Sequence, residues 1–504
     1  MAAFFLAVAL PILLVVLISS YALQLFHDSR RRLPPGPWPL PLIGNLHQLD
    51  RLPHRAMARL AARHGAPLMS LRLGAVLAVV ASSPDTAREV LQRRNADVAA
   101  RSIGDSMRAG GHCDSSVLCL PLRRRWRALR RLSAAELFSP PRHRDTEPLR
   151  REAVSGLVFL VSGHASRGAA VDVGRAAHAA ALGLLWRAVF SGDLDAATAG
   201  EVSDIVGEAS VLAAGPNVSD FFPAVAPADL QVVRQRMARR MEKLVAWTYM
   251  VIDQQIELRR RRRTAGEPRK NDLLDAALDM EGEVDEGEGW AMNQDAIRGM
   301  LMDLLVAGSG STTSTIEWAM AELLQNPRCM AQVQDEIKGV LGTRRHVEEH
   351  DISKLPYLQA VVKETLRLHP TVPIGLNKAE ATVEIHGYKI PEGTTVYVNL
   401  WDICRRAKAW DEPEEFMLER FDKDDVNFLG TNFELIPFGA GRRICLGMPL
   451  AERMLHLMLA SLLHRFEWTM LPEDGQQGGL DMAEQFGLVL SMATPLRAVA
   501  REIL

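Results

Sequence analysis

The chain has 504 residues, of which 48% are apolar and 24% charged, so it can bury a large core and is not disordered. Its 59 basic and 61 acidic side chains leave a formal net charge of −2, which argues against a nucleic-acid-binding protein, because such proteins carry a net basic domain. The odd number and irregular spacing of the five cysteines predict neither a disulfide framework nor a Cys/His zinc site.

The N-terminal segment predicts a membrane anchor. Residues 2–26 contain no charged side chain, and about 20 apolar residues are enough to span a bilayer as a helix. A cleaved signal peptide would begin with a basic side chain, whereas here the basic cluster Arg30 to Arg32 follows the apolar run. We therefore expect residues 1–29 to form an uncleaved transmembrane anchor. Because positive charge favours the cytoplasmic side, the rest of the chain should face the cytosol.

Residues 30–45 connect this anchor to the body of the protein. They include the stretch LPPGPWPLPLIGN, and proline both fixes its own φ and lacks an N–H group to donate. We expect a stiff, extended hinge that fixes the orientation of the body on the membrane.

Residues 46–504 predict one mainly α-helical domain with minor β structure, without internal repeats. Amphipathic stretches begin near residue 53, two short strands follow within 68–80, and helical periodicity then continues to about residue 260. The arginine run 259–263 and the acidic stretch 281–288 predict an exposed, mobile surface loop. Residues 295–325 predict a long apolar helix, 355–368 a second helix, and 382–400 short strands. A Gly-rich loop at 439–447 then leads into a helix that ends near Arg465.

The loop FGAGRRICLG, residues 438–447, carries the strongest chemical signal. A thiolate at Cys445 needs positive surroundings and backbone donors. Gly439 and Gly441 allow the tight turn that points amides at the sulfur. The following apolar run begins a helix whose N-terminal dipole favours negative charge. Gly447 leaves room where that helix must lie close to a flat cofactor. The alternative is a core cysteine in an ordinary loop.

This loop resembles the haem-binding signature FxxGxRxCxG of the cytochromes P-450. The resemblance implies the single-domain P-450 fold and haem b bound through Cys445 as the axial ligand of the iron, with Phe438 and Arg443 beside the cofactor. The stretch WRALR resembles the family's WxxxR, which implies that Trp126 and Arg130 meet a haem propionate. The alternative for this stretch is an amphipathic helix with a solvated basic face. In related enzymes such a face docks the NADPH–cytochrome P-450 reductase.

Two further motifs follow in the order that the family implies. Glu364 to Arg367 reads ExxR, with acid and base on one helix face. Glu419-Arg420-Phe421 resembles PERF with Leu418 in place of proline. The resemblance implies that Glu364, Arg367 and Arg420 form a buried ionic triad that supports folding and haem retention rather than chemistry.

The long helix contains AGSGSTTSTIEW, residues 307–318, where the family handles dioxygen. Ala307 and Gly308 fit the pattern, because small residues would open a notch for dioxygen. Gly310 replaces the expected acid, and Ser311 replaces the expected threonine while keeping a hydroxyl for a relay water. Thr312, or water beside Gly310, could substitute for the acid in proton delivery. The departure puts the coupling of NADPH use to product formation in doubt.

The function that the resemblance implies is a haem-thiolate monooxygenase of the endoplasmic reticulum membrane, using NADPH only through the reductase. Sequence details resemble plant microsomal enzymes of the geraniol-hydroxylase-like subgroup, which predicts a lipophilic terpenoid substrate. Five ranges carried over by position should line its cavity: 102–120, 211–222, 300–306, 371–376 and 486–489.

Two other functions stay open. One is a haem-thiolate isomerase or dehydratase acting on hydroperoxides, since such relatives also lack the acid–threonine pair. The other is a poorly coupled haem-binding protein with little turnover, for which the departures at Gly310, Leu418 and Arg406 speak. NADPH dependence separates the first from a monooxygenase, and formation of any product excludes the second.

Overall fold

The computed structural model describes residues 30–503 except 216, 225–232, 286–289, 422–425, 473 and 475–478, and also residues 15, 19, 21–23, 26 and 28. The predicted anchor, residues 1–29, therefore lies mostly outside the described residues. Within the described part, no helix is both long and apolar enough to cross a membrane. The predicted hinge carries no regular element from residue 33 to 39.

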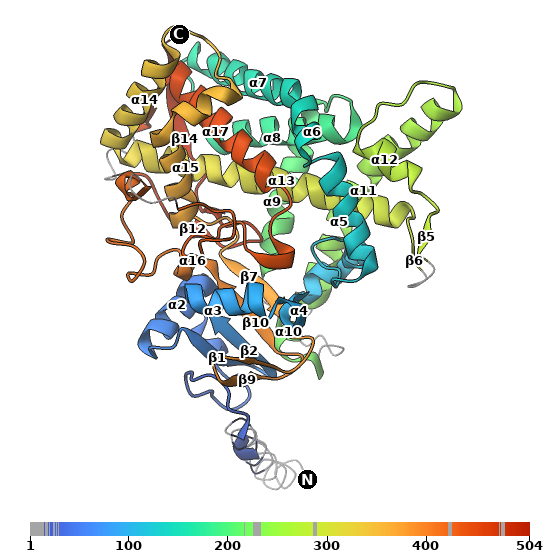
Figure 1. Ribbon diagram of the computed structural model, residues 1–504, viewed down its shortest axis with the longest axis vertical. Helices are drawn as coiled ribbons and strands as arrows, with labels where there is room; N and C mark the ends of the chain where they lie inside the picture. The colour runs from blue at the N-terminus through green and yellow to red at the C-terminus, as the bar shows by residue number, and fades with distance from the viewer. Residues whose placement is uncertain are drawn as a thin grey trace, which may run out of the picture.

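The body is mainly helical with minor β structure, as the sequence predicts (Figure 1). A sheet lies at the end of the molecule near the N-terminus, and the helices fill the rest. The helices of the first half of the chain are α2 (Pro53–Arg63), α3 (Pro84–Arg88), α4 (Asn95–Val98), α5 (Arg124–Glu136), α6 (Pro140–Asp145), α7 (Glu147–Ala165), α8 (Val173–Phe190), α9 (Ala196–Ala214), α10 (Val218–Phe221) and α11 (Val233–Thr264). Those of the second half are α12 (Leu273–Asp279), α13 (Gln294–Gln325), α14 (Pro327–Leu341), α15 (Pro356–Leu368), α16 (Leu400–Ile403) and α17 (Met448–Arg465).

The long helix α13 runs through the centre of the helical body (Figure 1). Asn293 caps its first turn by accepting a hydrogen bond from the Ala296 amide, and Pro327 begins the next helix directly after it. Most of its residues are buried on all sides, which explains why the sequence shows an apolar run rather than a single apolar stripe. Gly308 allows close packing on α8, since a Cβ there would lie 2.7 Å from Leu185 Cδ1.

The main sheet has the order β1-β2-β10-β7-β3. Strands β1 (Leu68–Leu73) and β2 (Val76–Ala81) form an antiparallel hairpin, and β10 (Thr395–Asn399) pairs in parallel with β2. Antiparallel β7 (Ile374–Lys378) and β3 (Ala100–Arg101) complete it. The remaining strands are β4 (Val171–Asp172), β5 (Val284–Asp285), β6 (Trp290–Ala291), β8 (Val383–Ile385), β9 (Tyr388–Ile390), β11 (Phe466–Met470), β12 (Glu484–Gln485), β13 (Ser491–Met492) and β14 (Arg497–Glu502). Residues 68–80 and 382–400 therefore contain strands, as predicted.

The prediction that residues 259–263 form an exposed, mobile loop is wrong. They form the last turns of α11, and Arg259 is buried. Its guanidinium contacts Asp272 at 2.7 Å and Asp275 at 2.8 Å, and Arg263 also contacts Asp275 at 2.6 Å. The arginines thus hold α11 against α12. Of the acidic stretch 281–288, residues 286–288 lie outside the described part of the chain.

The cysteine spacing also misled, because Cys113 and Cys119 form a disulfide with 5.1 Å between their Cα atoms. Cys113 lies at the end of the helix η3 (Asp105–Asp114), and the turn that follows brings Cys119, six residues later, into contact with it. The other three cysteines, Cys329, Cys404 and Cys445, are free.

Candidate functional site

The loop that carries Cys445 is shaped by two glycines with positive φ. Gly439 has φ +70° and Gly441 φ +69°, a region that L-residues with a side chain rarely adopt. At Gly441 a Cβ would also lie 1.8 Å from the Leu91 carbonyl oxygen, so only glycine fits. The Cys445 amide donates to the Phe438 carbonyl at 2.9 Å, which closes the loop directly before α17.

The Cys445 thiol lies deep in the fold yet remains accessible. The residue is exposed, while burial within the surrounding protein raises the pKa of the thiol. The Gly447 and Met448 amides and the charge of Arg130 pull this pKa the other way. A cation bound by a thiol deprotonates it outright, so a metal at this position would override the effect of burial. The sulfur could therefore hold a metal ion, with two amides and the Arg130 guanidinium beside it.

Three partly buried arginines gather beside this loop. Arg443 donates to the carbonyls of Ala99 at 2.5 Å and Leu120 at 2.6 Å, and Arg130 donates to the Ile444 carbonyl at 2.5 Å. Burial, together with the charges of Arg101 and Arg130, lowers the pKa of Arg443 to about 9. Burial likewise lowers the pKa of Arg101 to about 10.

These arginines fit a cofactor that carries carboxylates. Among the described residues, none of the three forms an ion pair with an acidic side chain, so their positive charge is compensated mainly by carbonyl oxygens. Buried charges normally have an opposite charge beside them. Two propionates would supply it. Arg130 donates to the carbonyl of Ile444, which directly precedes Cys445, so these charges lie beside the thiol. The donor set thus matches haem with Cys445 on its iron.

Residues of α13 approach the same space from another side. Ala307 is exposed although the helix around it is largely buried. The Ser311 hydroxyl, on the same helix face one turn later, donates to the Ala307 carbonyl at 2.7 Å. Thr312 is buried and donates to the Gly308 carbonyl at 2.9 Å. Both hydroxyls therefore donate to backbone carbonyls of α13. Of the two, only the Ser311 hydroxyl lies on the same side of the helix as the exposed Ala307.

Gly310 lies one helical turn after Ala307, beside two valines. A Cβ there would lie 3.6 Å from Val206 Cγ1 on α9 and 3.8 Å from Val489 Cγ2, which is ordinary contact. The position that an acid occupies in the family pattern thus has two valines beside it. Gly308 lies against Leu185 of α8, and the notch for dioxygen at Ala307 and Gly308 stays a prediction.

The predicted ionic triad is assembled in full. Arg367 binds both carboxylate oxygens of Glu364, at 2.7 and 2.8 Å, and Arg420 reaches the same carboxylate at 3.0 Å. Glu364 and Arg367 are completely buried. The two guanidinium groups also bind backbone carbonyls between residues 404 and 415, so the triad joins α15 to the segment that precedes the Cys445 loop.

Comparison with known proteins decides the family. The family model for cytochrome P450 matches residues 34–492. The chain is a cytochrome P450. It is 42% identical over 97% of its length to geraniol 8-hydroxylase of Catharanthus roseus, of which 99% is covered. It is 41% identical over 93% to carnosic acid synthase of Rosmarinus officinalis, 92% covered, and 38% identical over 93% to ferruginol synthase of Isodon rubescens, 94% covered. The P450 family implies a haem-iron cofactor and monooxygenase activity.

Two details of this P450 differ from what its motifs alone suggest. The Trp126 indole N–H donates to the Val117 carbonyl at 3.1 Å, and the guanidinium groups of Arg130 and Arg443 lie 5.2 and 5.4 Å from the centre of its ring. The N–H is thus used by a backbone carbonyl, and the contact of Trp126 with a propionate stays a prediction. Arg101 was missed by motif analysis, because it belongs to no motif and only the fold brings it to Arg443.

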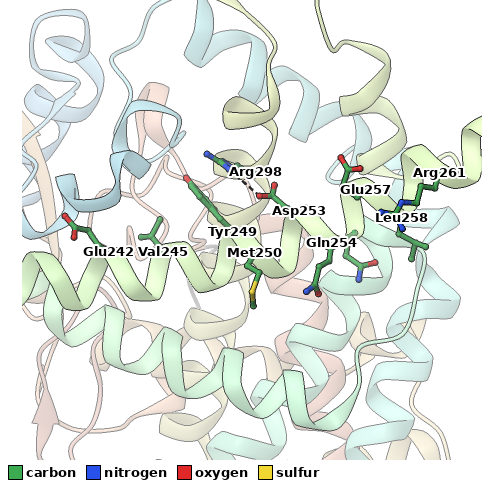
Figure 2. A pocket seen from close by; sticks show the side chains of 12 residues that line it. Glu242, Val245, Tyr249, Met250, Asp253, Gln254, Glu257, Leu258, Arg261 and Arg298 are labelled. Atoms are coloured by element: carbon green, nitrogen blue, oxygen red, sulfur yellow. Dashed lines mark hydrogen bonds and ion pairs between the residues drawn. The ribbon is translucent and has the colours of Figure 1, made fainter.

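A surface cavity of about 870 Å³ lies elsewhere in this P450. It is lined by one face of α11, including Tyr249, Asp253 and Leu258, and by Arg298 of α13 (Figure 2). None of its lining residues belongs to the site around Cys445, so we assign it no part in the haem chemistry.

Proposed function

We propose that this P450 hydroxylates a mono- or diterpenoid, using dioxygen and NADPH electrons that a membrane-bound NADPH–cytochrome P450 reductase delivers. The observation that carries the proposal is the similarity along nearly the whole chain to enzymes named for terpenoids, at 38 to 42% identity. Apolar side chains also surround α13 at this point, including Val206 and Val489 beside Gly310.

Haem, when bound, supplies the oxygen chemistry, and a thiolate ligand favours cleavage of the O–O bond. The protein contributes ligation and positioning. We propose that Cys445 holds the iron, that Arg101, Arg130 and Arg443 hold the propionates, and that Trp126 keeps two of these arginines aligned. Ser311 can release the Ala307 carbonyl and turn its hydroxyl to hold a proton-carrying water on the accessible face of α13.

The proposed reductase surface is the outer face of α5. Arg123, Arg127 and Arg131 are exposed there, and Arg130, one helical turn after Arg127, donates to the Ile444 carbonyl that precedes Cys445. The basic face therefore lies next to the cysteine loop. An acidic partner docked on it would bring its electrons to the cofactor over a short path, and opposite charge would speed the encounter.

We also propose that residues 1–29 anchor the protein in the endoplasmic reticulum membrane with the haem domain in the cytosol. The uncharged run 2–26 and the arginines that follow it support this orientation.

Microsomal turnover tests the proposed function. The full chain would be incubated with a plant reductase and NADPH and offered monoterpene alcohols and diterpene olefins, with NADPH use, oxygenated product and peroxide measured together. We expect an oxygenated terpenoid that forms only with NADPH. Product formed from a hydroperoxide without NADPH would favour the isomerase. NADPH use that yields only peroxide with every substrate would favour the poorly coupled protein, which the missing acid at Gly310 suggests.

A further inference from the structure

Asp303 of α13 is a buried carboxylate that binds one short loop, residues 113–119. Both of its oxygens accept from the Ser116 hydroxyl at 2.9 Å, and it accepts from the Val117 amide at 2.6 Å. The Leu118 amide lies at 3.4 Å, and His112 Nε2 lies 2.9 Å from the carboxylate. A carboxylate that accepts several N–H and O–H groups fixes its donors more firmly than a neutral acceptor does.

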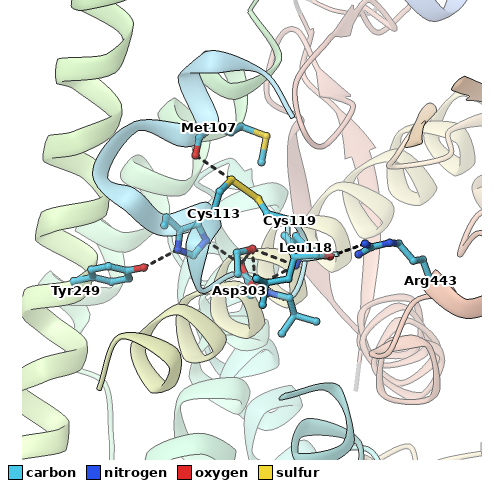
Figure 3. The surroundings of a disulfide bond; sticks show 11 residues. Met107, Cys113, Leu118, Cys119, Tyr249, Asp303 and Arg443 are labelled. Atoms are coloured by element: carbon cyan, nitrogen blue, oxygen red, sulfur yellow. Dashed lines mark hydrogen bonds and ion pairs between the residues drawn. A yellow bond between two sulfur atoms is a disulfide. The ribbon is translucent and has the colours of Figure 1, made fainter. Parts of the chain in front are cut away.

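The same helix face presses on this loop one turn earlier. A Cβ at Gly299 would lie 2.7 Å from Ser115 Cβ and 2.9 Å from its carbonyl oxygen, so the absence of a side chain lets the loop lie against α13. The Cys113–Cys119 disulfide closes the loop around the residues that Asp303 binds (Figure 3). Gly299 and Asp303, one turn apart on α13, thus both contact the loop that the disulfide closes.

The loop reaches the arginine cluster from its other side. The Val117 carbonyl accepts the Trp126 indole N–H at 3.1 Å, while the Val117 amide donates to Asp303. The Leu120 carbonyl, directly after the disulfide, accepts from Arg443 at 2.6 Å. A single peptide segment therefore joins the carboxylate on α13 to Arg443, proposed to hold a haem propionate, and to Trp126, proposed to align it.

A second connection leads from Asp303 to α11. His112 lies between them, with Nδ1 2.8 Å from the Tyr249 hydroxyl and Nε2 facing Asp303. An imidazole whose Nε2–H donates to the carboxylate can accept the phenol proton at Nδ1. Tyr249 also lines the surface cavity on α11, and Arg298 covers its ring at 4.6 Å.

We propose that Asp303 is a positioning residue for the cofactor site, acting through the loop 113–119 to place Trp126 and Arg443. The inference rests on the proposed haem site. It predicts that neutralising this one acid on α13 loosens the propionate end of the haem while leaving the thiolate ligand in place.

The test compares Asp303→Asn with Asp295→Asn in the full-length haem protein. Asp295 is a matched control, because it lies on the same helix and makes an exposed ion pair with Arg298 at 2.5 Å. Haem transfer to excess apomyoglobin measures the release rate, and resonance Raman propionate bands report the local geometry. We expect Asp303→Asn to release haem about tenfold faster, equivalent to about 1.4 kcal/mol, with shifted propionate bands. Asp295→Asn should match the wild type in both.

Wild-type release and unchanged propionate bands in Asp303→Asn would overturn the proposal. Faster haem release with unchanged propionate bands would overturn it too, because that is the result expected if the substitution only destabilises the fold. If Asp303→Asn does not fold, Ser116→Ala removes one donor to the same carboxylate and should shift the bands in the same direction by a smaller amount. If the wild-type protein lacks a thiolate-type spectrum, the proposed haem site itself is refuted. This result is distinct from a failure of the Asp303 proposal, which is measured on the propionate bands of the variants.

Discussion

Replacing Glu364 by Gln tests whether the buried ionic triad supports the fold. The change keeps the size of the side chain but removes the negative charge that two buried guanidinium groups share. Breaking a buried ion pair typically costs about 3–5 kcal/mol. Arg367 and Arg420 keep several backbone carbonyl partners, so the low end, about 3 kcal/mol, is expected.

This loss converts into a measurable change in thermal stability. An unfolding entropy of about 2.1 cal/mol/K per residue gives roughly 1 kcal/mol/K for a chain of this length, so Tm should fall by about 3 °C. Calorimetry of the haem-loaded protein measures it. Glu257→Gln is the control, because Glu257 forms an i,i+3 pair with Arg260 at 2.8 Å but is half exposed, and such pairs contribute about 1 kcal/mol at most. Equal Tm shifts in the two variants would refute the reasoning.

Three further predictions concern coupling, pH dependence and reductase docking. Gly310→Asp should lower the peroxide formed per NADPH relative to Gly310→Ala, which fills the same space beside Val206 without a proton donor; equal leakage would show that the missing acid does not limit coupling. Burial raises the pKa of Glu317 to about 7, so the folded protein keeps a proton on this carboxyl at pH values where the unfolded chain has lost it. The free energy of unfolding should therefore fall as pH rises from about 5 to 8, by roughly 1.4 kcal/mol per pH unit at most. Glu317→Gln should remove this pH dependence in urea titrations. Arg127→Glu on α5 should slow reductase-supported turnover at least about threefold at low salt and less at high salt, whereas Arg239→Glu on α11 should not.

Several helix ends can be predicted from capping residues and prolines in the sequence. Asn293 and Pro327 mark the two ends of α13, and Pro356 opens α15, so the predicted ranges 295–325 and 355–368 differ from the observed helices by one residue at most. These signals are local: a cap, a proline and an uninterrupted apolar run. They do not depend on which other element packs against the helix.

Tertiary partners explain where the prediction fails. The arginines 259–263 have the composition of a solvated loop, and only the return of α12 shows that Arg259 meets Asp272 and Asp275. The Cys113–Cys119 disulfide likewise depends on a turn in η3 that no cysteine pattern shows.

The candidate site divides in the same way. Cys445 and the pairing of Glu364 with Arg367 follow from spacing along the chain, because the loop and the helix each place their own residues. Arg101 and Asp303 could not be found, since each acts through contacts with residues far along the chain or through backbone carbonyls that have no sequence signature. The contact of Gly310 with Val206 also required the fold.

The most direct test of the central claim, a haem-thiolate P450 with Cys445 on the iron, is the carbon monoxide difference spectrum of the reduced protein. The wild type and Cys329→Ala would be compared with Cys445→Ala at equal haem content; Cys329 is free and half-buried. The account predicts the thiolate-type band in the first two and its loss in Cys445→Ala. A retained band in Cys445→Ala would contradict the ligand assignment and, with it, the site built around this residue.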